Sequence, residues 1–191
     1  MTSPLGRVQE WYDEAVAAGV REPEAMALAT ASPDGMPSVR IVLMKGIDHR
    51  GIRFFTNYES RKGRELEANP RAAATVYWQP LERAVRFEGA VERLAAEESD
   101  AYFASRGRGS RLGALASKQG RPIESREVLE TALAEAWAAY PGEDVPRPEY
   151  WGGYRIVPHA VELWQGRPDR LHDREHWLLG PDGWRSERLS P

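Results

Sequence analysis

The stretch Trp164–Arg174, WQGRPDRLHDR, concentrates residues that could bind an anion. The residues before it alternate like a half-buried strand, and the Gly166–Asp169 turn should reverse the chain into a second strand. On that strand Arg170, His172 and Arg174 would be spaced i, i+2, i+4 and would point to one side. Two guanidiniums that flank an imidazole repel one another unless an anion lies between them, and arginine matches phosphate or carboxylate geometry. The stretch therefore predicts either an anionic ligand or a solvated strand face paired with nearby carboxylates.

The run Arg40–Lys45, RIVLMK, is an apolar strand with a cation at each end. Arg40 and Lys45 have opposite parity, so on an ideal strand they point to opposite faces. They could share a ligand only if a β-bulge or the strand end re-aims one of them. Otherwise the run is a core strand whose charged ends lie in solvent.

The segment Thr56–Gly63, TNYESRKG, joins a strand to the start of a helix. Free N–H groups at a helix N-terminus attract anions, and Ser60, Arg61 and Lys62 lie beside them. This combination predicts a phosphate site. The alternative is an ordinary helix start, because the segment has no Walker motif and many helices begin with such residues.

A further cluster, Tyr102–Ser110, closes a helix with a turn rich in arginine, glycine and serine. Tyr102 and Arg106 are four residues apart on one helical face, so hydroxyl and guanidinium can meet there. With Ser110 they could form a second anion site, or the turn could be a basic helix end followed by a mobile loop. The later loop Ser117–Gly120 adds amide and main-chain donors.

Composition excludes several classes of function. The 191 residues carry a net charge of −3 with a pI of 5.9, which gives no electrostatic case for binding nucleic acid or an anionic membrane surface. The absence of cysteine excludes disulfides, thiolate metal sites and a thiol nucleophile, and the four histidines show no metal-ligand spacing. No run approaches transmembrane length, and the N-terminus lacks the apolar core of a signal peptide. We therefore expect a cytoplasmic, metal-free protein.

Lysine is rare in this chain, which has 23 arginines but only Lys45, Lys62 and Lys118. Since arginine serves wherever any positive charge will do, a lysine hints at a position that needs a compact point charge. No Ser–His–Asp order and no paired carboxylates stand out. This profile suits the binding of one or two phosphorylated ligands while a bound cofactor performs the chemistry.

Helices and short strands follow one another with connections too short for parallel crossovers, which predicts an α+β protein built on an antiparallel barrel. The predicted strands are Ala25–Ala31, Pro37–Lys45, Ile52–Thr56, Arg71–Trp78, Arg83–Arg93, Tyr154–Val157, Ala160–Gln165, Arg170–Leu179 and Trp184–Leu189. The predicted helices cover 4–19, 60–69, 95–105, 108–116 and 125–139. We expect one domain over 1–191, with an N-terminal helix in 1–24, barrel strands in 25–93, a helical segment in 94–140 and closing strands in 150–191.

Taken together, these motifs resemble the pyridoxine/pyridoxamine 5′-phosphate oxidase family. The resemblance runs in order through nearly nine-tenths of the chain, and the segment ending RLHDR is its most specific part. The motifs that carry it are RIVLMK (40–45), FTNYESRKGRELEANPRAA (55–73), YFASRGRGSRLGALASKQ (102–119), YWGGYRI (150–156), WQGRPDRLHDR (164–174) and ERLSP (187–191).

The resemblance implies a split β-barrel homodimer that binds FMN in clefts between the subunits. Such an enzyme oxidises pyridoxine or pyridoxamine 5′-phosphate to pyridoxal 5′-phosphate by hydride transfer to flavin N5, and O2 reoxidises the flavin, forming H2O2. Neither nucleic acid nor a membrane is an expected partner.

The resemblance also assigns roles to individual residues. FMN would be held by Arg40, Ile41, Val42, Leu43, Met44, Lys45, Phe55, Thr56, Ser60, Arg61, Lys62, Gln119, Gly120, Trp164 and Arg174. The substrate would be held by Lys45, Tyr102, Arg106, Ser110, Arg170 and His172. Arg170 and His172 would be the catalytic pair over the reacting pyridine face.

Three departures from the family pattern affect these expectations. Ala84 stands where a glutamine is usual, which removes one expected hydrogen bond to the flavin, and Gly120 replaces a usual serine. The family's basic N-terminal segment, which helps to cover the substrate, has no counterpart in this sequence. Two alternatives therefore stay open: a related FMN oxidase of the phenazine-biosynthesis type, and a carrier of flavin or pyridoxal phosphate without turnover.

Overall fold

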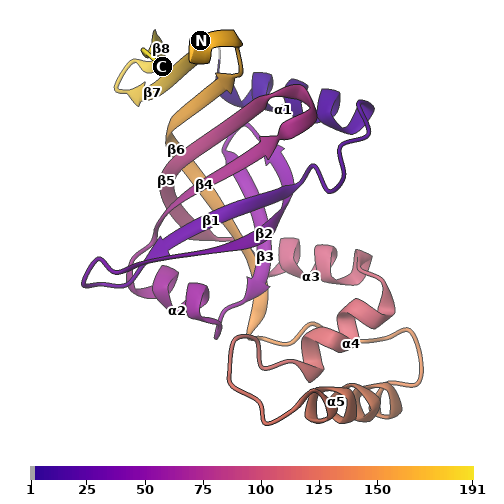
Figure 1. Cartoon of the computed structure of the whole chain (residues 1–191). Coiled ribbons are helices and arrows are strands. Elements are labelled where there is room, and N and C mark those ends of the chain that lie inside the picture. The colour runs from indigo at the N-terminus through magenta and orange to yellow at the C-terminus, as the bar shows by residue number, and fades with distance from the viewer. Residues whose placement is uncertain (1–2) are drawn as a thin grey trace.

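The computed structural model describes residues 3–191, and within that range eight antiparallel strands form one continuous sheet. The sheet order is β3-β2-β1-β4-β5-β6-β7-β8, and an additional pairing of β3 with β6 closes the first six strands into a barrel (Figure 1). The predicted α+β fold on an antiparallel barrel is confirmed. The strands are β1 (Ala25–Ala31), β2 (Pro37–Asp48), β3 (Gly51–Asn57), β4 (Arg71–Trp78), β5 (Arg83–Arg93), β6 (Trp151–Gln165), β7 (Asp173–Gly180) and β8 (Gly183–Arg188).

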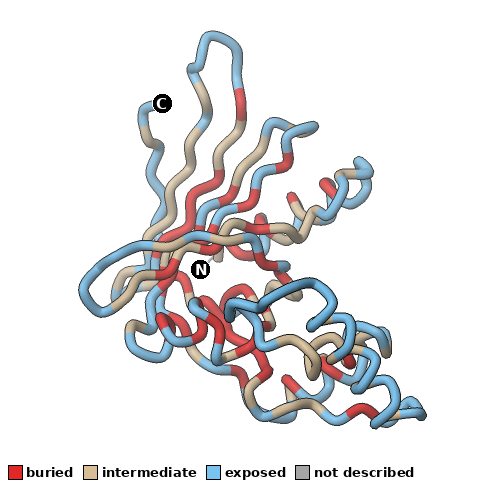
Figure 2. The backbone as a smooth tube through the Cα atoms, turned by 60° about the horizontal axis from the view of Figure 1, so that its bottom comes forward, coloured by how far each residue is buried: buried red, intermediate tan, exposed pale blue. Residues whose placement is uncertain are grey.

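The barrel core follows from the alternation of apolar residues along these strands. On β4, for example, alternate residues from Ala72 to Trp78 are buried, while Tyr77 points outward and is exposed. Figure 2 shows the buried residues gathered along the middle of the barrel, with exposed residues at the turns. Phe54, Phe87 and Met26 fill the interior and are fully buried.

Strand β6 is the longest strand, and it spans the barrel from one end to the other. It pairs with β5 from Tyr154 to Gln165, with β3 through its first half and with β7 through its second half. Two separate strands were predicted here, and that prediction is wrong because the chain runs on through Pro158. The register shifts between Glu88 and Gly89 opposite this proline, and a Cβ on Gly89 would lie 2.2 Å from the Val157 carbonyl oxygen. A bulge next to glycine therefore accommodates the proline without ending the strand.

Two helices close the barrel. Helix α1 (Pro4–Ala17) begins at Ser3, whose hydroxyl accepts a hydrogen bond from the Leu5 backbone N–H, and it buries Val8 and Trp11 against the barrel core. Helix α2 (Arg61–Ala68) begins at Ser60 and buries Leu66. In Figure 1, α1 lies towards one end of the barrel and α2 towards the other.

Helices α3 (Ala96–Ser105), α4 (Arg108–Ala116) and α5 (Arg126–Ala139) pack beside the end of the barrel at which β6 begins (Figure 1). They enclose a second, smaller core of Phe103, Leu112, Val145 and Trp151. The β7–β8 hairpin extends from the opposite end of β6 (Figure 1). None of the helices within residues 3–191 is both long and apolar enough to cross a membrane.

Candidate active site

A cavity of about 440 Å³ lies between β2, β3 and the turn that joins α3 to α4. Its size falls within the range of small-molecule sites, about 300–1,000 Å³. Four segments that are distant in the sequence meet there, as the motifs had predicted. The predicted site residues that line it are Ile41, Val42, Leu43, Lys45, Phe55, Thr56, Lys62, Tyr102, Arg106, Ser110 and Gln119.

Lys62 is the most tightly held cation of this cavity. Its Nζ donates to Thr56 Oγ1 at 3.0 Å, to Ser60 Oγ at 3.1 Å and to Gln119 Oε1 at 3.0 Å. Its side chain is buried, and burial lowers the pKa of Lys62 to about 8, with the positive charge of Arg40 acting in the same direction. All three acceptors are neutral oxygens, so no anion within residues 3–191 bonds to this ammonium group.

Arg40 and Arg61 share one buried carboxylate next to Lys62. Glu65 Oε2 lies 3.2 Å from Arg40 Nη2, and Glu65 Oε1 accepts from Arg61 Nε at 2.7 Å. Burial raises the pKa of Glu65, but hydrogen bonds from Ser38, Thr30 and Arg61 outweigh it and hold the pKa at about 2. The carboxylate is therefore ionised at neutral pH.

Arg106 contributes a free donor to the cavity. Its guanidinium lies over the Trp151 ring, 4.7 Å from the centroid, and burial lowers its pKa although nearby Tyr102 opposes this. The buried Nη1 of Arg106 has no hydrogen-bond partner among residues 3–191. Such an orphaned donor is costly unless a ligand satisfies it, which marks this wall as an anion-binding surface.

Lys45 lies on the same strand as Arg40 but on the opposite face. It lines the cavity together with Ile41 and Leu43, and its Nζ lies 3.2 Å from Glu24 Oε1. A register shift does occur in β2, between Met44 and Ile47, and Lys45 lies within it. Lys45 nevertheless lines the cavity with Ile41 and Leu43, whereas Arg40 does not line it and is held by Glu65, so the two cations remain apart as their parity predicted.

Five of the residues predicted to bind the cofactor in segments 40–62 and 119–120 do not line this cavity. Met44 packs in the barrel core, so only its main chain could reach a ligand. Ser60 caps α2, with its Oγ accepting from the Gly63 backbone N–H. Gly120 has a left-handed φ of 79° and offers main-chain groups only. The remaining two are Arg40 and Arg61, which Glu65 holds.

The segment Trp164–Arg174, which carries the rest of the predicted site, does not have the predicted backbone structure. Strand β7 begins only at Asp173, and Arg170 lies in a 3-10 turn, Pro168–Arg170, with a positive φ of 61°. Arg170, His172 and Arg174 therefore do not share one strand face, and the predicted i, i+2, i+4 geometry is wrong. Because the backbone at Asp169 and Arg170 is left-handed, the strand begins three residues later than predicted, at Asp173 instead of Arg170.

The three side chains have separate environments. Arg170 is exposed, whereas the His172 ring lies 4.5 Å from the Trp164 ring, and His172 Nδ1 accepts from the Arg167 backbone N–H at 3.2 Å. Arg174 forms a bidentate pair with the buried Glu162, at 2.7 and 3.1 Å. For Arg174, the structure therefore agrees with the alternative interpretation, in which the cations of this segment pair with nearby carboxylates and do not bind a ligand.

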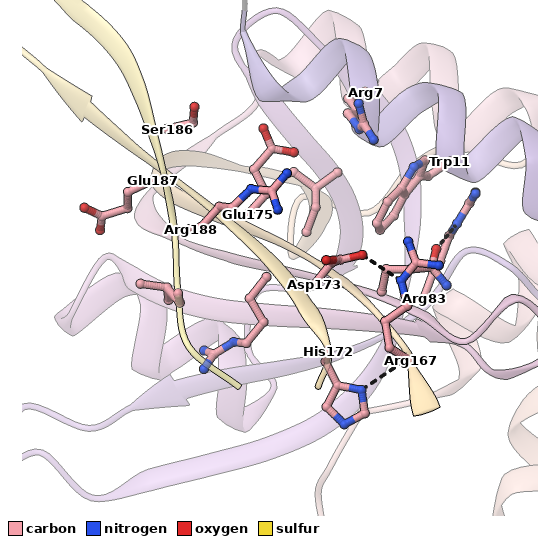
Figure 3. A pocket seen from close by; sticks show the side chains of 14 residues that line it. Arg7, Trp11, Arg83, Arg167, His172, Asp173, Glu175, Ser186, Glu187 and Arg188 are labelled. Atoms are coloured by element: carbon pink, nitrogen blue, oxygen red, sulfur yellow. Dashed lines mark hydrogen bonds and ion pairs between the residues drawn. The ribbon is translucent and has the colours of Figure 1, made fainter. Parts of the chain in front are cut away.

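His172 and Arg174, but not Arg170, border a second cavity, of about 720 Å³, between α1 and the β7–β8 hairpin. Figure 3 shows Arg83, Arg167 and Arg188 among acidic side chains in this cavity, with Trp11 on the α1 side. Arg167 Nε donates to Asp173 at 2.7 Å, and Arg83 lies over the Trp11 ring, 4.7 Å from the centroid. Three of its arginines, Arg83, Arg167 and Arg174, are therefore already paired with carboxylates.

The two halves of the predicted site lie at opposite ends of β6. Trp151 begins the strand and lines the first cavity, whereas Trp164 lies thirteen residues further along. That separation corresponds to about 40 Å of extended strand, far more than the length of a small cofactor. Figure 1 shows the same separation between α3–α4 and the β7–β8 hairpin. Within one chain, a single ligand cannot contact both halves.

Sequence reasoning missed several residues of the site. Trp151 was not among the predicted site residues, but it lines the cavity and stacks on Phe55 and Tyr102 at 5.7 and 6.2 Å. Glu65 and Glu162 had no predicted role, although Glu65 lies four residues after Arg61 and Glu162 forms an ion pair with Arg174 of the neighbouring strand. A search for carboxylates near predicted cations would have found Glu65.

Comparison with known proteins agrees with this geometry. Residues 12–140 match the family model described as pyridoxamine 5′-phosphate oxidase, and residues 151–191 match the model of the pyridoxine 5′-phosphate oxidase C-terminal dimerisation region. The chain belongs to the pyridoxamine 5′-phosphate oxidase family. Within it, the chain is 59% identical to a pyridoxine/pyridoxamine 5′-phosphate oxidase of Bordetella petrii, over 99% of this chain and 90% of the relative. The corresponding protein of Rubrobacter xylanophilus is 56% identical over 98% of this chain and 87% of its own length.

Solved structures of the oxidase family share the fold. PhzG from Burkholderia lata, solved with tetrahydrophenazine-1-carboxylic acid, has a TM-score of 0.95 and 34% identity, covering 100% of this chain and 94% of its own. A pyridoxamine 5′-phosphate oxidase-related, FMN binding protein of Nostoc punctiforme has a TM-score of 0.81 with full coverage of both chains. At 18% identity the second likeness shows the fold alone. The split barrel predicted from the sequence is thus confirmed, and the chain is an oxidoreductase of this family.

Proposed function

We propose that this chain is an FMN-dependent oxidase that converts pyridoxamine or pyridoxine 5′-phosphate to pyridoxal 5′-phosphate. The observation that carries the proposal is the cavity at β2 and β3, where cations without bound anions face an apolar strand. Lys62 has only neutral acceptors, and Arg106 keeps a buried donor without a partner among residues 3–191. Two separate cationic groups suit two phosphates, one on a cofactor and one on a substrate.

The residues present fit a flavin phosphate at Lys62 and a ring along β2. Lys62, Thr56 and Gln119 supply charged and polar groups at one side of the cavity. Ile41 and Leu43 supply an exposed apolar surface of the kind that an aromatic ring covers, with exposures of 66% and 39%. Ala84 is the exception, because a methyl group cannot donate a hydrogen bond to a ring.

When bound, FMN would supply the electron acceptor, with N5 as the hydride acceptor for substrate C4′ and O2 as the final oxidant, giving H2O2; the amine substrate would also consume water and release ammonia. Lys45, Tyr102, Arg106 and Ser110 would hold the substrate phosphate. Arg170 and His172 would orient the pyridine ring and stabilise charge on it, because positioning supplies much of the rate of such a transfer. No side chain is required as a covalent nucleophile.

The site needs a second copy of the chain. Trp151, beside Arg106, and Trp164, beside His172, are about 40 Å of strand apart, so Arg170 and His172 would serve the cavity of a partner subunit rather than their own. Val39, Ile41 and Leu43 form an exposed apolar row on one face of β2, at 68%, 66% and 39% exposure, which a partner would cover. We therefore propose a homodimer with FMN at the subunit interface.

A second candidate is an oxidase of the phenazine-biosynthesis type, which the TM-score of 0.95 to PhzG favours. That substrate carries a carboxylate on a fused ring system and no phosphate. Arg106, Lys45 and Ser110 gathered in one cavity favour a phosphorylated substrate. The cytoplasmic location inferred from the sequence stays a prediction.

A turnover assay separates these candidates. The purified protein saturated with FMN should convert pyridoxine 5′-phosphate aerobically to pyridoxal 5′-phosphate with an equal amount of H2O2. Unphosphorylated pyridoxine is the matched control and should react far more slowly. Absence of product with FMN saturated would reject the B6 phosphate oxidase, and absence of flavin binding would reject both oxidase candidates.

A further inference from the structure

Glu65 occupies an unusual position for a carboxylate, inside a cationic site. It lies in the second turn of α2, and its side chain is only 7% exposed. Its Oε2 accepts from Thr30 Oγ1 at 2.5 Å and from Ser38 Oγ at 2.6 Å, while its Oε1 accepts from Arg61 Nε at 2.7 Å. Both oxygens are therefore used, and the donors come from β1, β2 and α2.

The same carboxylate fixes Arg40. Arg40 Nη2 lies 3.2 Å from Glu65 Oε2, and Arg40 Nη1 donates to Thr30 Oγ1 at 2.6 Å and to the Leu28 carbonyl at 3.2 Å. Arg40 also donates to Ser38, which itself bonds to Glu65. Glu65 thus ties a guanidinium from β2 to a guanidinium from the first turn of α2, next to Lys62.

The cluster remains attractive to an anion despite this carboxylate. Arg40, Arg61 and Lys62 carry three positive charges at neutral pH against one negative charge on Glu65, which leaves a net charge of +2 (3 − 1 = 2). Hydrogen bonds from Ser38, Thr30 and Arg61 keep Glu65 ionised, so it continues to hold both arginines when a phosphate arrives. A fixed guanidinium loses less rotamer freedom on binding than a mobile one.

We propose that Glu65 is a positioning residue for the cofactor phosphate: it holds Arg40 and Arg61 outside the cavity lining but close to Lys62, so that their fixed positive charge adds to that of Lys62 at the phosphate. This inference rests on the proposed function, since it takes the phosphate of FMN as the anion. Glu65 does not itself touch the ligand. Its effect should therefore appear in the preference for FMN over a flavin that lacks the phosphate.

The test compares the dissociation constants of FMN and riboflavin, each measured by quenching of flavin fluorescence, in wild type and Glu65→Gln. A glutamine must turn its NH2 group towards one set of donors, because Thr30, Ser38 and Arg40 surround one oxygen and Arg61 bonds to the other. We expect the preference for FMN to fall about 10-fold or more. Riboflavin affinity should change by less than about twofold, since it depends on the ring and not on the phosphate cluster.

Glu67→Gln is the matched control on the same helix. Glu67 pairs with Arg93 at 2.7 Å on the exposed side of α2, with both side chains more than half exposed. Its removal should leave both flavin affinities unchanged. Thermal unfolding of each variant shows whether it is folded, and Glu65→Asp, which keeps the charge but has a shorter reach, should give an intermediate preference.

The measured affinities distinguish a failure of the proposed role of Glu65 from a failure of the proposed phosphate site. An unchanged ratio of FMN to riboflavin affinity in folded Glu65→Gln and Glu65→Asp would show a purely structural role, and an increased ratio would show that Glu65 repels the phosphate. Either result overturns the inference while leaving the proposed function intact. A wild-type protein that binds riboflavin as tightly as FMN would instead overturn the phosphate site itself.

Discussion

The two ends of the barrel both carry arginines, but their charges are satisfied in different ways. At the β2–β3 end, Lys62 is held by neutral oxygens and Arg106 keeps an orphaned donor within residues 3–191. At the β7–β8 end, Arg174 and Arg167 are each paired to a carboxylate at 2.7 Å. The first end can receive anions, whereas at the second end the exposed Arg170 has no side-chain hydrogen bond or ion pair within residues 3–191.

This difference fits the proposed homodimer, in which the two ends of the chain would have different roles. The β2–β3 end would bind both phosphates, while the Trp164–Arg174 segment would act on a ligand that a partner holds. Arg174 and Glu162 would fix that segment rather than recognise an anion directly. Substitutions that affect only one end of the barrel test this difference between the two ends.

The largest effect is expected from Arg170→Ala. Because Arg170 would stabilise charge on the reacting substrate, its loss should lower turnover roughly 100-fold or more, with FMN affinity nearly unchanged. Arg167→Ala is the matched control on the same turn, since Arg167 is 56% exposed and pairs only with Asp173. Steady-state kinetics and flavin content per chain measure both effects. Loss of flavin with unchanged turnover per bound FMN would contradict the assignment.

A smaller effect is expected from pH at the other end. The folded pKa of Lys62 is lowered to about 8 from 10.5, so the free protein loses this charge as pH rises through 8, and the contribution of Lys62 to stability rises from about pH 8 to 10.5. A bound phosphate favours the charged ammonium, so FMN affinity should fall by up to about tenfold per pH unit above pH 8. Fluorescence titrations from pH 7 to 9.5 measure this slope. Lys62→Met should bind more weakly and without the slope, whereas Lys118→Met, on an exposed lysine, should keep it.

The smallest effect is expected from Ala84→Gln. Ala84 pairs with Trp164 across β5 and β6 and lines a hollow of about 370 Å³, which leaves room for a longer side chain. If the flavin of a partner lies against Trp164, the new amide should tighten FMN binding about two- to tenfold. Ala90→Gln on the same strand should change nothing. Unchanged binding in Ala84→Gln would show that the hollow is not beside the flavin.

Much of the fold could be predicted because it depends on local patterns. Ala25–Ala31, Arg71–Trp78 and Arg83–Arg93 were predicted with the bounds that the structure gives, since each alternates buried and exposed residues between clear turns. Strand β6 was divided wrongly because proline normally ends a strand, and the bulge that tolerates Pro158 depends on Gly89 in a different strand. That pairing cannot be read from β6 alone.

The site could be predicted only as a set of residues, not as an arrangement. Parity correctly separated Arg40 from Lys45, but it failed for Arg170 and His172 because a left-handed turn precedes the strand. The 40 Å of strand between Trp151 and Trp164 follows from β6 being one strand, which the sequence did not show. The roles given to individual residues stay predictions.

The central claim, that each site combines the β2–β3 end of one chain with the Arg170 end of its partner, can be tested in heterodimers purified through two different tags. A dimer of one Arg106→Ala chain and one Arg170→Ala chain would contain one intact site and should show about half of the wild-type turnover. A dimer of one wild-type chain and one chain carrying both substitutions would have each site damaged and should be nearly inactive. If each chain instead built its own site, the two results would be reversed, with the first dimer nearly inactive and the second half active.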